Sequence, residues 1–354
     1  MPLGHKAIPF PCRNDTIKDN ILRFSAIITS ILESHLSGYT IISEFHFVTL
    51  SDDSEISVTL ILRFIAIIGV LAMHLVQNSE ASSVVSKGDF DKDFFVTWSP
   101  SHVNTSADGL LRSLKLDNES GSGFASNDTF LFGQFNMQIK LIEGDSAGTV
   151  VAFYLQSNQT NGDNEMDFEF LGNVIGQPYI LQTNVIIDGN ANREERIHLW
   201  FDPTKDFHTY SILWNLHQIV FMVDWVPIRT YRNYTAKGVS FPQWQPMRLL
   251  ISLWDGDNWA TRGGRDKIDW SKGPFIASFK NYKIDACVWN GDAESCGEDN
   301  STTNWWQNER FNTLTGTQRR LFKWARKYHL IYDYCQDNVR FQNKLPLECY
   351  LPKY

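Results

Sequence analysis

The chain has 354 residues, of which 43% are hydrophobic, 20% charged and 14% aromatic. This composition is that of a folded globular protein and excludes a disordered or collagen-like chain. The formal charge is −8 and no run of five or six basic residues occurs, so binding to nucleic acid phosphates is disfavoured. The 12 Trp, 12 Tyr and 24 Phe suit a β-sheet core or a surface that stacks against sugars.

The first predicted element is an apolar run at residues 64–73 (FIAIIGVLAM), with Arg63 before it and small polar residues at 79–83. This pattern is typical of a secretory signal peptide, and it is too short for a membrane span of about 20 residues. A buried core helix is the alternative interpretation. We therefore expect a signal peptide at residues 58–82 and no membrane association after its removal. Residues 1–57 form an extension of unknown role, which a mis-set translation start or a signal anchor would explain.

Possible glycan acceptors agree with export. Six N-x-S/T triplets lie after the expected signal peptide, although each one alone is weak evidence because the pattern is short. They begin at Asn104, Asn118, Asn127, Asn158, Asn233 and Asn300.

Short alternating runs of apolar and polar residues follow between residues 94 and 285, with Asn, Asp, Gly and Pro between them. The clearest runs are at 132–140, 149–155, 208–214 and 219–224. A period of two residues predicts β-strands. Many short strands with such breaks favour an antiparallel sandwich or barrel over a parallel sheet with crossover helices.

The segment 164–172 (NEMDFEFLG) is an acidic strand in this series. Glu165, Asp167 and Glu169 alternate with apolar residues, so the three carboxylates share one face. Neighbouring like charges destabilise a sheet and raise one another's pKa. Such a row suits glycoside chemistry, which needs one deprotonated and one protonated carboxyl. A solvated acidic face and a calcium site are the alternatives, but calcium prefers oxygens wrapped around a loop.

The spacing of these carboxylates does not decide the stereochemistry. Residues i and i+4 of a strand have Cα atoms about 13 Å apart. Retaining glycosidases need carboxyl groups about 5–5.5 Å apart, and inverting ones about 6.5–9.5 Å. Strand curvature and long Glu side chains must close the gap in either case.

Four of the five cysteines lie late in the chain, at Cys287, Cys296, Cys335 and Cys349, while Cys12 lies in the extension. Four cysteines allow three pairings. The four lack the closely spaced pairs of a zinc site, and no metal site is expected. Two local disulfides, 287 with 296 and 335 with 349, are the preferred interpretation.

Residues 316–330 predict a helix in this tail. Leu321, Trp324, Ala325 and Tyr328 fall at helical spacing, and Arg and Lys residues take the other face. A surface helix packed on the sandwich is the simplest interpretation. A binding role for its basic face is the alternative.

The acidic strand is part of a wider resemblance. Residues 165–172 (EMDFEFLG) resemble the E-x-D-x-E-F-L-G signature of plant xyloglucan endotransglucosylase/hydrolases, in glycoside hydrolase family 16. The likeness covers about residues 88–350. It continues at 201–211 (FDPTKDFHTYS), 259–264 (WATRGG), 269–272 (DWSK) and 332–335 (YDYC).

The resemblance implies an all-β protein. Residues 83–285 would form a concanavalin-like β-jelly-roll sandwich with the catalytic site, and residues 286–354 a C-terminal extension with a helix and two disulfides. It implies a secreted enzyme of the cell wall and apoplast that acts on xyloglucan by a retaining double displacement, without a cofactor. Its partners would be xyloglucan donor and acceptor chains, and we expect a monomer. A β-glucanase with another substrate and a lectin-like binding module are the alternatives.

By the same resemblance, Glu165 is similar to the nucleophile, Glu169 to the general acid/base, and Asp167 to a helper between them. Trp259, expected to be exposed on its loop, looks like an acceptor platform together with residues 262–264. Asn164 and Asn258 depart from the residues common in the family, and Asn173 lacks the Thr that makes a glycan acceptor. The positions that resemble glucan contacts are Gln182, Thr183, Asn184, Asn192, Arg193, Glu194, Asn258, Trp259, Gly263 and Arg340.

Overall fold

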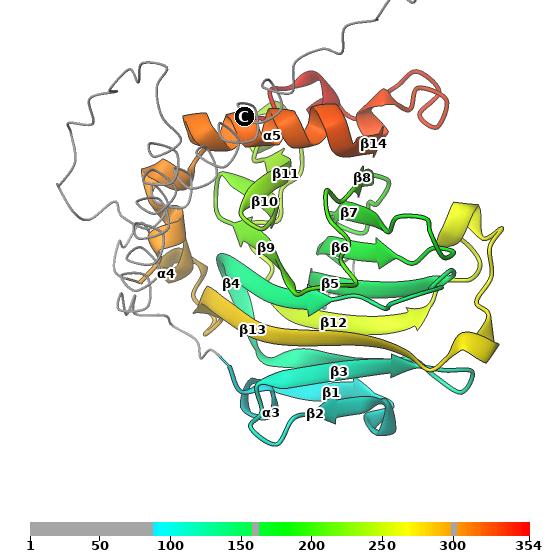
Figure 1. Ribbon diagram of the computed structural model, residues 1–354. Coiled ribbons are helices and arrows are strands. Elements are labelled where there is room, and N and C mark those ends of the chain that lie inside the picture. Colours follow the sequence, from blue (N-terminus) through cyan, green and yellow to red (C-terminus); the bar gives the residue numbers. More distant parts are fainter. Residues whose placement is uncertain (1–87, 158–162, 299–302) are drawn as a thin grey trace, which may run out of the picture. The chain divides into compact units, whose positions relative to one another are not determined.

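The computed structural model describes residues 88–157, 163–298 and 303–354 (Figure 1). The expected extension and signal peptide at residues 1–82 lie outside these residues, as do Cys12, Asn158 and Asn300. None of the helices in the described part of the chain combines the length and the hydropathy of a membrane-spanning segment.

Antiparallel strands form two layers. The first sheet contains, in spatial order, β1 (Phe94–Trp98), the first half of β4 (Ser122–Lys140), β12 (Met247–Asp255), β5 (Thr149–Ser157), β6 (Glu165–Leu171), β7 (Ile180–Ile186), β8 (Glu195–His198) and β14 (Leu330–Asp333). The second contains β11 (Val226–Arg232), β10 (Gln218–Val223), β9 (His208–Trp214), the second half of β4, β13 (Phe275–Val288), β3 (Leu111–Leu116) and β2 (Val103–Thr105).

Strand β4 is shared by both sheets. It pairs with β12 up to Phe130 and with β9 from Gly133 onward. Between these segments the backbone takes positive φ angles, +67° at Phe132 and +145° at Gly133. A Cβ atom on Gly133 would lie 2.4 Å from the Cβ of Ala286, so glycine is needed where the strand passes between layers.

Aromatic side chains fill the space between the sheets. The Phe168 ring of β6 lies 5.2 Å from the Phe221 ring and 5.8 Å from the Tyr210 ring, both of the second sheet. Met166, Phe168 and Phe170 are fully buried. The predicted period-two pattern and the all-β sandwich are therefore confirmed, and the four alternating runs lie in β4, β5, β9 and β10.

The C-terminal extension is joined to the sandwich by a strand. Strand β13 continues to Val288, beyond the expected boundary at residue 285, and β14 adds to the first sheet beside β8. Figure 1 shows β14 next to α5, at the end of the series β5, β6, β7, β8. Disulfides join Cys287 to Cys296 and Cys335 to Cys349, with Cα–Cα distances of 5.5 and 5.2 Å.

In the residues that the structure describes, the helices are few and short, apart from α5 in the extension. They are α3 (Phe90–Asp93), α4 (Ala293–Gly297) and α5 (Gly316–His329), with 3₁₀ turns η1 (Pro100–His102), η2 (Thr235–Lys237), η3 (Thr261–Gly263), η4 (Trp270–Lys272), η5 (Trp305–Gln307), η6 (Glu309–Phe311), η7 (Tyr334–Gln336) and η8 (Leu347–Tyr350). Helix α5 begins with a capping box between Thr315 and Gln318.

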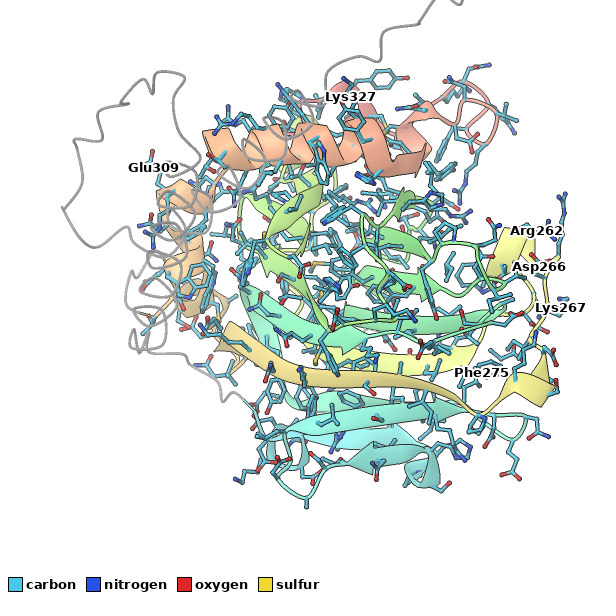
Figure 2. The ribbon with its side chains drawn as sticks, in the orientation of Figure 1. Arg262, Asp266, Lys267, Phe275, Glu309 and Lys327 are labelled. Carbon is cyan, nitrogen blue, oxygen red and sulfur yellow. A yellow bond between two sulfur atoms is a disulfide. The ribbon has the colours of Figure 1, made fainter. Side chains whose placement is uncertain are left out.

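Helix α5 packs with a different stripe from the one expected. Phe322 and Ala325 are buried, but Tyr328, which the spacing placed among the packed residues, is 60% exposed. The buried face of α5 is thus the one that carries Phe322 and Ala325. The Tyr328 side chain, in the last turn of the helix, is exposed to solvent. The exposed basic residues of the helix include Lys327, which Figure 2 labels.

A buried ionic cluster anchors α5 and the chain end to the first sheet. Arg326 donates to Glu195 on β8 and, at 2.5 Å, to Asp333 on β14. Lys353 donates to the same two carboxylates at 3.0 Å each. Two cations therefore neutralise two carboxylates that are almost fully buried.

The possible glycan acceptors differ in accessibility. Asn104, Asn118 and Asn127 are exposed. Asn233 is partly buried, and its Nδ2 donates to the Leu216 carbonyl at 2.7 Å. The same nitrogen also donates to Gln243 Oε1 at 3.3 Å, whereas Nδ2 of the exposed Asn127 donates to the Lys92 carbonyl. A glycan replaces one of the two amide hydrogens, so Asn233, which uses both within the fold, is disfavoured as an acceptor.

Candidate active site

The acidic strand β6 lies inside the first sheet, between β5 and β7. Its carboxylates point away from the aromatic core, because the alternate residues Met166, Phe168 and Phe170 fill it. The register sets Glu165 opposite Gln156 and Ile186, Asp167 opposite Tyr154 and Asn184, and Glu169 opposite Ala152 and Gln182.

Asp167 is the most buried of the three carboxyl groups, at 4% exposure. Burial raises its pKa well above the ordinary value, and the nearby Glu165 carboxylate, with which it shares a hydrogen bond, raises the pKa further. Burial thus favours the protonated form of Asp167, which donates toward Glu165. Gln156 Nε2 also donates to Glu165 Oε2, at 2.6 Å. Gln156 and the protonated form of Asp167 thus both orient Glu165.

Glu169 lies in a different environment. Burial raises its pKa, while a hydrogen bond from Gln182 lowers it in part. Gln182 Nε2 donates to Glu169 Oε2 at 2.6 Å, and Gln182 Oε1 accepts from Arg196 Nε at 2.7 Å. Arg196 thereby fixes the orientation of the Gln182 amide. A carboxyl group with a raised pKa beside an oriented carboxylate is a pair suited to acid/base and nucleophilic work.

Replacing Gln182 with leucine removes the donor that lowers the pKa of Glu169, so we expect that pKa to rise. The protonated acid then persists to higher pH, and the alkaline limb of the kcat profile moves upward. Activity measured against pH tests this, with Gln138→Leu on the second sheet as the control. An unmoved alkaline limb would mean that Glu169 is not the titrating acid.

Thr183 does not reach the acidic face, contrary to the expectation. It lies opposite Phe168, on the core side of β7, and is 2% exposed. Its carbonyl and hydroxyl oxygens accept from Arg229 Nη1 at 2.7 and 3.1 Å. Its neighbours Gln182 and Asn184 take the acidic face because side chains alternate along a strand.

Arg193 is used within the fold. Its Nε donates to Glu348 in the extension at 2.7 Å, and its Nη1 donates to the Asn190 carbonyl at 2.7 Å. With 13% of its side chain exposed, the guanidinium holds the extension against the β7–β8 loop. Direct contact with a glucan is therefore disfavoured for Arg193.

Three other predicted residues meet at one point. Arg340 from the extension donates to Glu194 and to Asn192, each at 2.6 Å. Its Nη1 also lies 3.1 Å from the Tyr332 hydroxyl on β14. The extension thus adds a charged group beside the end of β8, on the β7 side of the acidic strand.

Trp259 lies on the loop after β12 and is half-buried, so it is less exposed than expected. Its ring centre is 6.0 Å from that of Trp254, and it packs against a small cluster that contains Leu171. Thr261 Oγ1 donates to the carbonyl of Gly172, which directly follows β6. The loop that carries Asn258, Trp259 and Gly263 is therefore anchored at the Glu169 end of the acidic strand.

The outer part of this loop is held by an ion pair. Arg262 and Asp266, neighbours in Figure 2, form two contacts of 2.5 Å. Asn258 is exposed, and nothing lies within 4 Å of a Cβ built on Gly263, which has a φ of +70°. These two positions are therefore open to a ligand.

Sequence reasoning missed three groups at the site. Gln156 and Tyr154 of β5 lie directly opposite Glu165 and Asp167 of β6, on the same face of the sheet as the carboxylates. Arg196 orients the Gln182 amide. Alternation in 149–156 places Ala152, Tyr154 and Gln156 on one face of a strand. The register that brings this face beside β6 could not be read from the sequence.

Comparisons with known proteins agree with this geometry. Residues 90–272 match the family model Glycosyl hydrolases family 16, and residues 300–349 match Xyloglucan endo-transglycosylase (XET) C-terminus. The chain is 66% identical over 293 residues to Probable xyloglucan endotransglucosylase/hydrolase protein 10 of Arabidopsis thaliana, covering 82% of this chain and 97% of that protein. It is 48% identical over 264 residues to Xyloglucan endotransglucosylase protein 7 of Diospyros kaki, covering 74% and 97%.

One family model matches the sandwich and the other the extension. The sequence identity of 66% to the Arabidopsis relative is far above the level needed to assign a chain to a family. The alignment covers 97% of that relative. The chain therefore belongs to the xyloglucan endotransglucosylase/hydrolases of glycosyl hydrolase family 16.

Proposed function

We propose that this chain cleaves the β-1,4-glucan backbone of xyloglucan with retention and transfers the glycosyl fragment to another xyloglucan chain or to water. The observation that carries the proposal is the buried Asp167 between two carboxyl groups with different environments, Glu165 bonded to Gln156 and Glu169 bonded to Gln182. The names of the relatives supply the substrate.

In the first step, the Glu165 carboxylate attacks the anomeric carbon of the donor and forms a glycosyl ester. The bond to the leaving oxygen breaks, and Glu169 gives its proton to that oxygen. Asp167 keeps Glu165 oriented through their hydrogen bond. Asp167 Oδ1 is buried and has no hydrogen-bond partner among the described residues.

In the second step, Glu169 is deprotonated and acts as a base. It takes the proton of an acceptor hydroxyl while that oxygen attacks the anomeric carbon, and the ester to Glu165 breaks. Both groups return to their starting protonation states. The acceptor is a sugar hydroxyl in transfer and water in hydrolysis.

We expect transfer to exceed hydrolysis when acceptor is present. Positioning an acceptor can lower the barrier by about 7–11 kcal/mol, enough for a bound sugar to outcompete unordered water. The test follows donor chain length, incorporation of a labelled oligosaccharide and new reducing ends together. Trp259→Ala should shift the balance toward hydrolysis. Equal growth of reducing ends with and without acceptor, and no incorporated label, would identify a hydrolase instead.

We further propose that the chain is secreted to the cell wall and apoplast and acts there as a monomer. The two disulfides support an oxidising compartment. N-terminal sequencing of the exported protein should find a start near Ser82, where the predicted signal peptide ends. A start before Arg63 would contradict this prediction.

A further inference from the structure

The described strands leave β1 at one end of the first sheet, paired only with β4. Its last residue, Trp98, is 38% exposed although it is a large aromatic side chain. We propose that Trp98 is the platform of a distal sugar-binding subsite for the donor chain, several glucosyl residues from the cleaved bond. This inference rests on the proposed function and adds a binding residue to it.

The sheet register connects Trp98 to the acid/base. Trp98 lies opposite Gly123, Gly123 opposite Ser252, Ser252 opposite Ala152, and Ala152 opposite Glu169. Directly opposed residues in antiparallel strands share a face, so the five positions form one row across the sheet. Strands β4 and β6 are three spacings apart, or about 14 Å, a length that a β-1,4-glucan covers with a few residues.

The positions between Trp98 and Glu169 have the smallest side chains available. Gly123 has none, Ala152 a methyl group and Ser252 a hydroxymethyl group. No side chain larger than serine lies in this row between the Trp98 ring and the Glu169 carboxyl group. Such a row leaves room for a flat, uncharged polymer that crosses the strands.

The Trp98 ring is held in place by the backbone under it. A Cβ atom on Gly123 would lie 2.2, 2.6 and 2.9 Å from three carbons of the ring. The ring therefore lies on the β4 backbone, and only glycine leaves room for it. Glycine inside a strand weakens the strand and often marks a close approach of this kind.

A second exposed ring lies beside the first. Phe95 is 44% exposed and lies opposite Ala125, in the row that leads through Leu250 and Tyr154 to Asp167. The row that starts at Asp167 thus ends at Phe95, and the row that starts at Glu169 ends at Trp98. Both rows end at an aromatic ring on β1. Exposed rings of this size contribute little to the core, and flat rings stack on the apolar faces of sugars.

The position of Trp98 favours the donor chain. The polar residues predicted to contact the glucan, Gln182, Asn184 and Arg340, lie on the other side of β6, toward β7, β8 and the extension. We assign these residues to the acceptor chain. The donor chain then binds on the opposite side of β6, over β5, β12, β4 and β1.

The binding test uses the inactive Glu165→Ala protein and xyloglucan oligosaccharides of increasing length. Trp98→Leu should weaken binding of long oligosaccharides about tenfold and leave short ones unchanged, while Trp98→Tyr restores most of the affinity. Gly123→Ala should act like Trp98→Leu because the new Cβ displaces the ring. Tyr328→Ala, an exposed ring on α5, is the matched control and should have no effect.

The kinetic test uses the active enzyme. Trp98→Leu should raise the KM for the polymeric donor about tenfold, with kcat and the acceptor KM unchanged. A length-independent change, no change, or a change in the acceptor KM alone would overturn the inference. Failure of Glu165→Ala to bind xyloglucan at all would instead contradict the proposed function. Thermal unfolding checks that each variant folds. If Trp98→Leu does not fold, the same measurements on Trp98→Tyr and Gly123→Ala test the inference.

Discussion

Turnover in Glu165→Ala is expected to fall roughly ten-thousand-fold, while xyloglucan binding remains. The substitution removes the group that forms the glycosyl ester, and binding depends on contacts remote from that carboxylate. Neighbouring Asp167 is a poor replacement, because it is almost fully buried and burial disfavours its charged form. Transfer to a labelled acceptor and titration of oligosaccharide binding give the two measurements.

The companion variant Glu169→Ala separates the two roles. It should also lose activity on polymeric donors, whose leaving oxygen needs a proton, but it should keep part of its turnover on a donor with a leaving group that departs unprotonated. Glu309→Ala, on a surface turn of the extension labelled in Figure 2, is the control for removing a carboxylate and should keep full activity. Full activity in either catalytic variant would overturn the assignment of roles.

Arg326→Met is expected to lower the free energy of unfolding by about 3 kcal/mol. It leaves Glu195 and Asp333 buried, with Lys353 as the remaining ion-pair partner that they have among the described residues. Lys327→Met, one residue further along α5 and exposed, should change stability by less than about 0.5 kcal/mol. Urea unfolding of the three proteins gives the comparison, and equal midpoints would show that the buried cluster does not stabilise the extension.

The same cluster makes stability depend on pH. Burial alone would raise the pKa of Glu195, but Arg326 and Lys353 outweigh it and lower the pKa to about 2. A carboxyl group with a lower pKa in the folded state stabilises the protein above its ordinary pKa, and this contribution is lost as the pH falls toward 2. The difference between the wild type and Arg326→Met should therefore shrink on acidification.

The sequence was sufficient to place the acidic strand and the sandwich, because a period of two is a local property. It also contained the reason to exclude Thr183, since residues 182 and 184 cannot share a face with residue 183. The pair of Arg193 and Glu348 was beyond local reasoning, because 155 positions separate the two residues. Trp98 had no local signal either, because its position opposite Gly123 depends on the register of β1 with β4.

Both ends of the first sheet consist of short strands with an irregular register. Strand β1 has five residues and a shift between Val96 and Trp98, and β14 has four residues and a shift between Leu330 and Tyr332. Unpaired backbone groups on a long, regular edge would recruit strands from neighbouring molecules, and short, irregular edges prevent this. Because β14 comes from the extension, removal of the extension would bare β8 and promote aggregation of the sandwich.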